Sequence, residues 1–285
     1  MVQAVISKII SLQNNFTVGE NEIAQYIMNH ADDVVTSTIT TIAKKTNTSE
    51  ASVNRFCKKI GFKGFNSFKV ALAQETFYNN MNRSENTTES DSFISSVSRD
   101  YRQLLRNTSA MLDEAVLGKA ADAIKKASNV YIFSYSSNAL IATEAEYKLS
   151  MIGIKAKAIT NITDMYLCAA NVQPADAVIF IVHTIIMRDI FHSLNTCRDR
   201  NATIISITSY DSPKLDDLVD YKFVTSDKIT AKNAISISNN LVFLFVLDVI
   251  YSYLLESDKT LRQRKLSNEA IINNHQMLDN YLFDY

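Results

Sequence analysis

The sequence ITTIAKKTNTSEASVNRFCKKIG, from Ile39 to Gly61, has the pattern of two short helices joined by a tight turn. The first predicted helix carries apolar residues at the i, i+3 and i+4 spacing of one helix face, namely Ile39, Ile42 and Ala43. Asn47 and Thr48 interrupt this spacing. Ser49 follows, and its hydroxyl is suited to accept a backbone N–H as the N-cap of a second helix. We therefore predict a helix pair over this segment.

The second predicted helix has an apolar face and a polar face. The apolar face must pack against the first helix, and its members are Val53, Phe56, Cys57 and Ile60. Ala51, Arg55 and Lys58 lie on the opposite face, with Asn54 and Lys59 on its flanks. This arrangement is typical of a helix-turn-helix module, which lays its second helix in the major groove of DNA. The alternative is an ordinary helical hairpin whose charged face is simply solvated.

Charge favours the DNA-binding interpretation. From Ile39 to Leu72 the chain has seven Lys or Arg residues and one Glu, a net charge of +6, although the whole chain has a net charge of −1. A basic segment in an otherwise acidic protein is expected where a surface must meet phosphates.

The composition indicates a folded protein of about two domains. The chain has 285 residues, of which 47% are hydrophobic and 21% charged, and these values argue against extensive disorder. Its most apolar stretch, from Ala234 to Leu255, is interrupted by Asn239, Asn240 and Asp248, so we predict a buried helix and no membrane span. The start of the chain lacks the pattern of a signal peptide. Three widely spaced cysteines without metal-ligand spacing indicate reduced thiols, and we expect a cytoplasmic protein.

The pattern along the chain predicts an all-α domain followed by an α/β domain. Helical periodicity runs through residues 1–77, where Phe62, Phe65 and Phe68 are expected to close the core and to leave Lys63 and Lys69 outside it. A polar segment, 78–95, is predicted as a linker. Residues 96–260 alternate helical segments with short β-branched runs, which predicts a parallel sheet flanked by helices. The predicted strands are 130–133, 156–159, 177–182, 203–208 and 221–224. Residues 261–285 are predicted as a last helix and tail.

Two segments of the N-terminal part resemble the RpiR (MurR/RpiR) family of bacterial transcriptional regulators. They are NEIAQYIMNHADDV, from Asn21 to Val34, and SEASVNRFCKKIGFKGFNSFK, from Ser49 to Lys69. Members of this family join a helix-turn-helix domain to a SIS (sugar isomerase) domain that binds phosphosugars, and the resemblance covers about residues 1–255. It implies contacts to double-stranded operator DNA from the second helix, with its N-cap, and from one lysine beyond it: Ser49, Glu50, Ser52, Asn54, Arg55, Lys58, Lys59 and Lys63.

The two phosphosugar-binding loops of a SIS domain are altered in this chain. The turn that usually reads Gly-x-Gly-Ser is Ser134 to Ser137, and the loop that usually reads Ser-x-Ser-Gly-x-Thr is Val182 to Met187, where only Thr184 keeps a hydroxyl. Loss of the glycines removes easy access to positive φ and close backbone approach to an anion. The resemblance nevertheless implies a partial ligand site at Ser134, Ser136, Ser137, Asn138, His183 and Thr184. The alternatives are that residues 136–138 only cap a helix, and that His183 is a structural side chain.

We therefore expect a DNA-binding regulator of carbohydrate metabolism genes, without catalytic residues, metal site or cofactor. The resemblance implies a homodimer or tetramer and a phosphosugar effector. One alternative function is a SIS-type phosphosugar isomerase, although an isomerase needs a general base and neither loop contains Glu or Asp. The other is a regulator whose SIS domain serves only as a dimer scaffold.

Overall fold

The computed structural model describes residues 4–84, 92–231 and 233–276. The chain forms two compact units. Unit 1 comprises Met1–Leu112, Ser209–Pro213 and Val224–Val242, and unit 2 comprises Asp113–Thr208, Lys214–Phe223 and Phe243–Tyr285. This division differs from the predicted domain boundaries in two ways: unit 1 extends to Leu112, and it includes two segments that follow strands of the sheet.

Unit 1 is helical, and its first helices, up to residue 84, surround one apolar core. The buried core includes Ile23, Ile42, Phe56 and Phe68, each of which has no exposed surface. Phe62 and Phe65 are also buried, as predicted. The elements are α1 (Val5–Ser11), η1 (Gln13–Asn15), α2 (Val18–Asn29), α3 (Ala31–Thr36), α4 (Ile39–Lys45), α5 (Glu50–Lys59), α6 (Phe65–Ser84), α7 (Phe93–Met111) and η4 (Lys228–Thr230).

The segment 78–95, which is predicted as a linker, is helical at both of its ends. Helix α6 continues to Ser84, and α7 begins at Phe93 after the N-cap Ser92; residues 85–91 lie outside the described residues. The polar residues 79–84 contain neither Gly nor Pro. Asn and Ser cost less than ~0.7 kcal/mol each in a helix, so a helix that is already nucleated can continue through them.

Three polar contacts tie the segments that follow β4 and β5 to the N-terminal helices of unit 1. Asn15 Nδ2 donates to the carbonyl of Asp211 at 2.9 Å, and the backbone N–H of Asp211 donates to the carbonyl of Ser11 at 2.9 Å. The hydroxyls of Ser7 and Ser226 lie 2.9 Å apart, and both residues are buried. The segments after β4 and β5 are thus hydrogen-bonded to α1 and η1.

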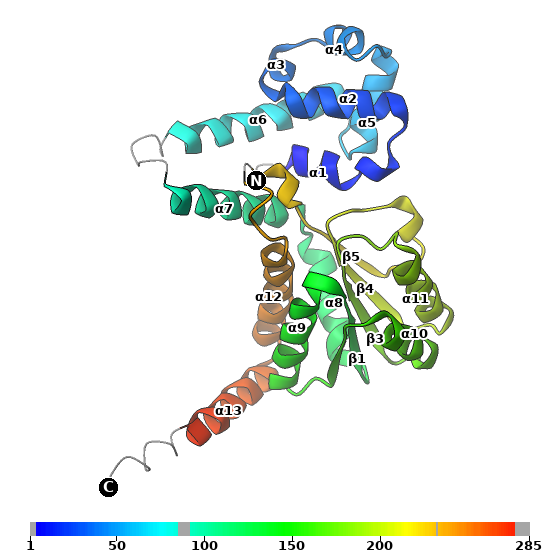
Figure 1. Cartoon of the computed structure of the whole chain (residues 1–285), viewed down its shortest axis with the longest axis vertical. Coiled ribbons are helices and arrows are strands. Elements are labelled where there is room, and N and C mark those ends of the chain that lie inside the picture. The colour runs from blue at the N-terminus through cyan, green and yellow to red at the C-terminus, as the bar shows by residue number, and fades with distance from the viewer. Residues whose placement is uncertain (1–3, 85–91, 232, 277–285) are drawn as a thin grey trace. The chain divides into compact units, whose positions relative to one another are not determined.

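Unit 2 contains a five-stranded sheet in the order β2-β1-β3-β4-β5. Strand β1 pairs in parallel with β2 and β3, and β3 pairs in parallel with β4. Figure 1 shows α10 and α11 on one side of the sheet and α8, α9 and α12 on the other. The strands are β1 (Val130–Phe133), β2 (Ala156–Ile159), β3 (Ala177–Ile181), β4 (Thr203–Thr208) and β5 (Tyr221–Val224). The helices are α8 (Glu114–Lys126), η2 (Ser136–Asn138), α9 (Ala139–Met151), α10 (Ile162–Asn171), α11 (Arg188–Asp199), η3 (Pro213–Leu215), α12 (Asn240–Ser257) and α13 (Lys259–Gln276).

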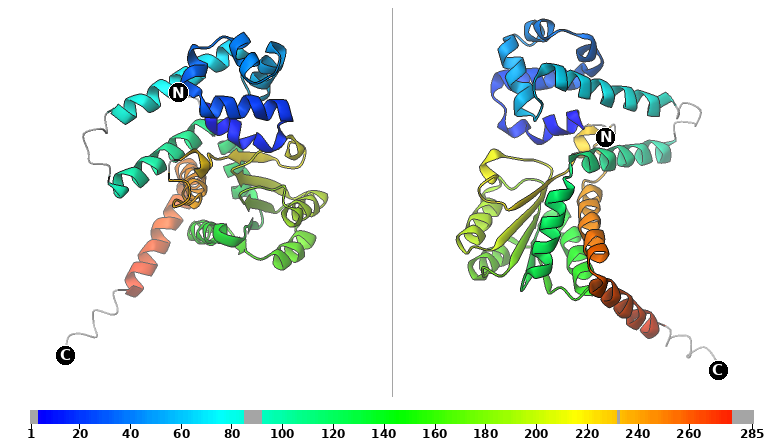
Figure 2. Two further views of the ribbon diagram at one scale, coloured as in Figure 1. Left: turned by 45° about the horizontal axis from the view of Figure 1, so that its top comes forward. Right: turned by 180° about the vertical axis from the view of Figure 1, so that it is seen from behind.

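The sheet confirms the predicted α/β fold. All five residues of β3 are buried, as expected for a strand that is covered on both faces. Helix α12 corresponds to the most apolar stretch of the sequence and is followed directly by α13 (Figure 2). By length and composition alone α12 qualifies as a membrane-spanning candidate, and 39% of its residues are buried within the protein. A helix that covers a sheet has the same composition, so this property does not identify a membrane span.

Candidate functional site

Two side-chain caps define the α4–α5 helix pair. The hydroxyl of Thr38 accepts from the backbone N–H of Thr41 at 3.2 Å, and that of Ser49 accepts from the N–H of Ser52 at 3.1 Å. Asn47, in the turn between the helices, has a φ of +49°, a conformation that Asn tolerates better than most residues. The predicted break and the predicted N-cap are therefore confirmed.

The apolar face of α5 is buried as predicted. Val53, Phe56 and Cys57 have no exposed surface, and Ile60 is 2% exposed. They pack in the same core as Ile42 and Ala43 of α4. Burial raises the pKa of the Cys57 thiol to about 12, so this side chain packs as an apolar group. This face fixes the orientation of α5 and leaves its opposite face in solvent.

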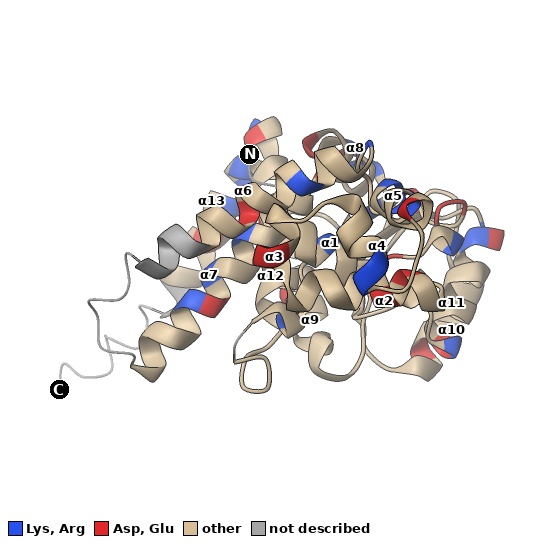
Figure 3. Ribbon diagram, turned by 90° about the horizontal axis from the view of Figure 1, so that it is seen from above, with Lys and Arg blue, Asp and Glu red and all other residues tan. Residues whose placement is uncertain are grey.

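The outward face of α5 presents cations at its centre. Ala51, Arg55 and Lys58 are exposed. One guanidinium nitrogen of Arg55, Nη2, donates to the hydroxyl of Ser52 at 3.2 Å, and the hydroxyls of Ser52 and Ser49 lie 2.9 Å apart. Figure 3 shows Lys and Arg on α5 and on α4, whose last turn contains the exposed Lys44 and Lys45. Lys63, just beyond α5, is exposed as well.

Three other polar residues of this module hold its helices together. Asn54 Oδ1 accepts the backbone N–H of Phe65 at 3.0 Å and so caps the start of α6. Lys59 Nζ donates to Glu20 Oε2 at 2.7 Å and to the carbonyl of Asn15 at 2.8 Å. Glu50 Oε1 accepts the hydroxyl of Thr40 on α4 at 2.6 Å. The family resemblance places Asn54, Lys59 and Glu50 among the expected DNA contacts. Their partners within the protein lie 10 to 44 residues away in the sequence, so no local spacing reveals these contacts.

The carboxylate of Glu20 is adapted to its ion pair with Lys59. Burial raises the pKa of Glu20, but the hydrogen bonds from Lys59 and from the backbone N–H of Thr17 outweigh burial, so the pKa is lowered overall. Thr17 and Glu20 together form a capping box at the start of α2. Lys69 is also tied within the fold, because its Nζ donates to the carbonyl of Ser37 at 2.8 Å. Lys69 lies outside the buried core, as predicted, and is half-buried.

Sequence reasoning missed Glu75 on α6. Its side chain is buried, with 4% of the residue exposed, and Oε2 accepts the backbone N–H groups of Val5 at 2.8 Å and Ile6 at 3.3 Å. Burial raises the pKa of this carboxyl group to about 7, although the two backbone hydrogen bonds act in the opposite direction. Ala71 and Leu72, one turn earlier on the helix, are the sequence signal for burial at this position, but they do not reveal the contact to α1.

The first predicted phosphosugar loop follows β1 in unit 2. Ser134 is fully buried, and its hydroxyl donates to the carbonyl of Ile181 at 2.6 Å, so it joins the ends of β1 and β3. Ser136 has a φ of +56°. The sequence led us to expect that loss of the glycine would remove the left-handed backbone conformation here. Ser136 nevertheless adopts that conformation, at a cost of about 1 to 2 kcal/mol. Ser136 and Ser137 are exposed, and Asn138 is half-buried directly before α9.

The second predicted loop, Val182 to Met187, follows β3. Ile185 is fully buried in the core formed with α10 and α11, whereas His183 is exposed. The hydroxyl of Thr184 accepts the backbone N–H of Ile186 at 3.4 Å. The hydroxyl of Tyr135 donates to the Met187 sulfur and thereby connects the two loops. The structure thus brings both loops to the carboxyl edge of the sheet, but places Ser134 and Ile185 in structural roles.

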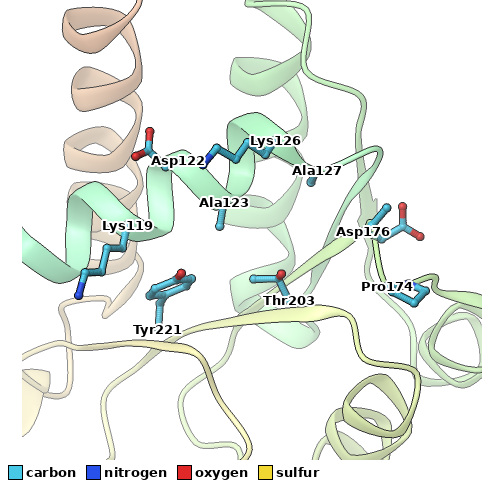
Figure 4. A pocket seen from close by; sticks show the side chains of 10 residues that line it. Lys119, Asp122, Ala123, Lys126, Ala127, Pro174, Asp176, Thr203 and Tyr221 are labelled. Atoms are coloured by element: carbon cyan, nitrogen blue, oxygen red, sulfur yellow. The ribbon is translucent and has the colours of Figure 1, made fainter.

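Two open cavities accompany the sheet. One, of about 760 Å³, lies beside the second loop and is lined by Tyr166, Ile186, Arg188, Asp189, Phe191, His192 and Asn195. The other, of about 410 Å³, lies at the opposite end of the strands, where α8 faces the first residues of β4 and β5, Thr203 and Tyr221 (Figure 4). Within residues 4–84, 92–231 and 233–276, no group of three or more His, Cys, Asp or Glu side chains is placed to hold a metal ion.

Comparison with known proteins matches both parts of the chain. The helix-turn-helix domain of the RpiR family matches residues 3–78, and the SIS domain matches residues 123–253. An HTH-type transcriptional regulator of Haemophilus influenzae is 30% identical over 263 residues, which cover 90% of this chain and 91% of that protein. HexR, an HTH-type transcriptional regulator of Escherichia coli, is 26% identical over 213 residues, 73% of each chain.

Among solved structures, the Vibrio vulnificus NanR protein complexed with ManNAc-6P has a similar fold. The TM-score is 0.59 at 21% identity, with 95% of this chain and 98% of that chain covered. The sugar isomerase domain of an RpiR transcription factor from Sphaerobacter thermophilus has a TM-score of 0.55 at 16% identity and covers 64% of this chain and 97% of its own. The α4–α5 pair turns its polar face to solvent, and a parallel sheet follows it later in the chain. This chain belongs to the RpiR family of transcriptional regulators, which combine a helix-turn-helix domain with a SIS domain.

Proposed function

We propose that this regulator binds operator DNA as a homodimer or tetramer in the cytoplasm, with α5 in the major groove, and controls genes of carbohydrate metabolism. The observation that supports the DNA contact is the outward face of α5, where Arg55 and Lys58 are exposed while the opposite face is buried. Lys44, Lys45 and Lys63 add positive charge to the same module. Such a surface attracts DNA phosphates and allows the helix to reach base edges.

The DNA contact is tested by the double substitution Arg55→Ala with Lys58→Ala. Neither side chain is part of the core, so we expect the circular dichroism spectrum to stay unchanged and gel-shift binding to genomic fragments upstream of the gene to be lost. The matched control is Lys119→Ala with Lys126→Ala, which removes two exposed cations from α8 in unit 2. Equal gel-shift affinity in the α5 variant and the wild type would refute the proposed contact.

The proposed effector is a phosphosugar that binds at the carboxyl edge of the sheet. The likeness to the NanR structure with ManNAc-6P supports this class of ligand, and the positive φ of Ser136 supports a backbone shape that can approach an anion. Because Ser134 and Ile185 are committed to the core, we assign the site to the remaining residues of the two loops: Ser136, Ser137, Asn138, His183 and Thr184.

Thermal-shift measurements with a panel of hexose and N-acetylhexosamine phosphates test the effector site. We expect one phosphosugar to raise the melting temperature of the wild type and to have no effect on Ser136→Ala with Ser137→Ala. The matching unphosphorylated sugar is the control. If no sugar phosphate shifts the wild type, the SIS domain is a dimer scaffold, which is the alternative function.

We propose that the chain is not an enzyme. Neither loop at the sheet edge offers a carboxylate that could serve as a general base for isomerisation. Incubation of the purified protein with sugar phosphates, followed by separation of aldose and ketose isomers, is expected to show no turnover. Turnover that His183→Ala abolishes would support the isomerase alternative instead.

A further inference from the structure

We propose that Ala51 and Arg55 read the bases of each operator half-site, with the Arg55 guanidinium on a guanine and the Ala51 methyl group against the methyl group of a neighbouring thymine. Lys58 and Lys63 hold phosphates, and Lys59 stays paired with Glu20 and the carbonyl of Asn15. This inference rests on the proposed contact of α5 with the major groove. It names the sequence feature that the contact recognises.

Three polar side chains of α5 already have partners within the protein, so they are not assigned to bases. Lys59 contacts Glu20 and the carbonyl of Asn15, and its Nζ lies 5.5 Å from the centre of the Phe16 ring. Asn54 caps α6 through its Oδ1, and a Cβ added at Gly64 would lie 2.8 Å from the same oxygen, so there is no free space on that side of the amide. Glu50 accepts a hydrogen bond from the hydroxyl of Thr40 on the neighbouring helix.

Arg55 is held in place by a short series of hydroxyl groups. The Ser49 hydroxyl accepts the N–H of Ser52 at 3.1 Å and lies 2.9 Å from the Ser52 hydroxyl, which in turn accepts from Arg55 at 3.2 Å. These contacts position the guanidinium over the first two turns of α5, the part of a recognition helix that contacts base edges. A guanidinium pairs with O6 and N7 of guanine through two parallel hydrogen bonds, the commonest specific contact in the major groove.

Ala51 lies one turn before Arg55 on the same exposed face. Residues at i and i+4 are neighbours on a helix, about 5 to 6 Å apart at their Cβ atoms, so the two side chains reach adjacent base pairs. The side chain of Ala51 is a methyl group without polar atoms. In the major groove such a group is matched by the C5-methyl of thymine. Its small size also permits close approach of the helix to the groove floor.

Lys58 and Lys63 lie farther along the chain, beyond these first turns. Each carries a flexible stem with a point charge, which suits a phosphate oxygen better than the planar edge of a base. A phosphate contact adds affinity for every sequence equally and makes that affinity fall with salt. Ala51 and Arg55 therefore set the sequence preference, and Lys58 and Lys63 set the overall affinity.

Selection of bound duplexes from a pool with a randomised 24-base-pair region tests the proposal with the full-length protein. We expect the wild type to select two half-sites, each with a guanine next to a thymine. Arg55→Gln should change the preferred base at the guanine position to adenine, the base that Gln pairs with, and weaken binding to the wild-type site about 5- to 150-fold. Lys58→Gln should keep the selected sequence and lower affinity for all duplexes alike.

The thymine contact is tested by a change in the DNA, which leaves the folding of the protein unaffected. Replacing the selected thymine by deoxyuridine removes only its methyl group and should weaken wild-type binding several-fold, whereas Ala51→Gly should bind both duplexes equally. Lys126→Gln in unit 2 is the protein control. If the wild type binds no duplex at 50 mM salt, the proposed function fails. If the wild type selects a sequence that Arg55→Gln selects equally, or ignores the uridine replacement, only this inference is overturned.

Discussion

Glu75 makes the stability of unit 1 depend on pH. The ordinary pKa of a Glu carboxyl is 4.5, and burial raises that of Glu75 to about 7. Between these two values the folded protein binds a proton at this site that the unfolded chain releases. The stabilisation that protonated Glu75 gives the folded state is therefore fully present below about pH 4.5 and is lost as the pH rises through 7. The difference in pKa corresponds to about 3 kcal/mol, at ~1.4 kcal/mol for each tenfold change in proton affinity.

The substitution Glu75→Gln isolates this contribution, because the amide has nearly the same shape and does not titrate. We expect the stability of the wild type relative to Glu75→Gln to fall by about 2.5 kcal/mol between pH 5 and pH 8. Hydrogen exchange of the α1 amides, followed by mass spectrometry after correction for the intrinsic rate, reports unit 1 directly. Glu22→Gln, which changes an exposed carboxyl of the same unit, is the control. Parallel stability curves for wild type and Glu75→Gln would refute the reasoning.

Three further substitutions test contacts described above. Lys59→Gln breaks the contacts to Glu20 and Asn15 and should lower stability by about 1 kcal/mol in urea unfolding, while the slope of log affinity against log salt for DNA binding stays unchanged. Asn54→Ala removes the cap of α6 and should cost about 1 kcal/mol, measured as faster hydrogen exchange in the first turn of α6. Ser136→Gly relieves the positive φ and should raise the stability of unit 2 by about 1 kcal/mol, whereas Ser136→Ala should bring no gain.

The elements that sequence reasoning located correctly depend on short-range patterns. The run TIISIT coincides with β4, Thr203–Thr208, because a strand buried on both faces is a continuous apolar run. Ser49 was identifiable as an N-cap because its partner, the N–H of Ser52, lies only three residues away. The apolar spacing of α5 likewise fixed which of its faces is buried. Periodicity and caps are local, and a single sequence contains them.

The features that escaped prediction depend on partners far apart in the chain. Lys59 and Glu20 are 39 residues apart, and Glu75 and Val5 are 70 apart, so no local spacing marks either contact. Ser134 was predicted to contact a ligand because it occupies a loop position that binds phosphosugars in the SIS domains it resembles. Its hydroxyl instead donates to the carbonyl of Ile181, 47 residues away. At Ser136 the residue type suggested a changed backbone, but the surrounding strand end and helix start impose the left-handed conformation in the absence of glycine.

The hydrogen bonds from α1 and η1 to Asp211 and Ser226 affect how such regulators can be recombined. A chimera made by joining the first 84 residues to a foreign sensor would lack the segments 209–213 and 224–242, which belong to the same compact unit as the DNA-binding helices. The polar groups of Ser7, Ser11 and Asn15 would then lose these partners. A chimera that keeps this unit intact therefore has to carry both of these segments along with the DNA-binding helices.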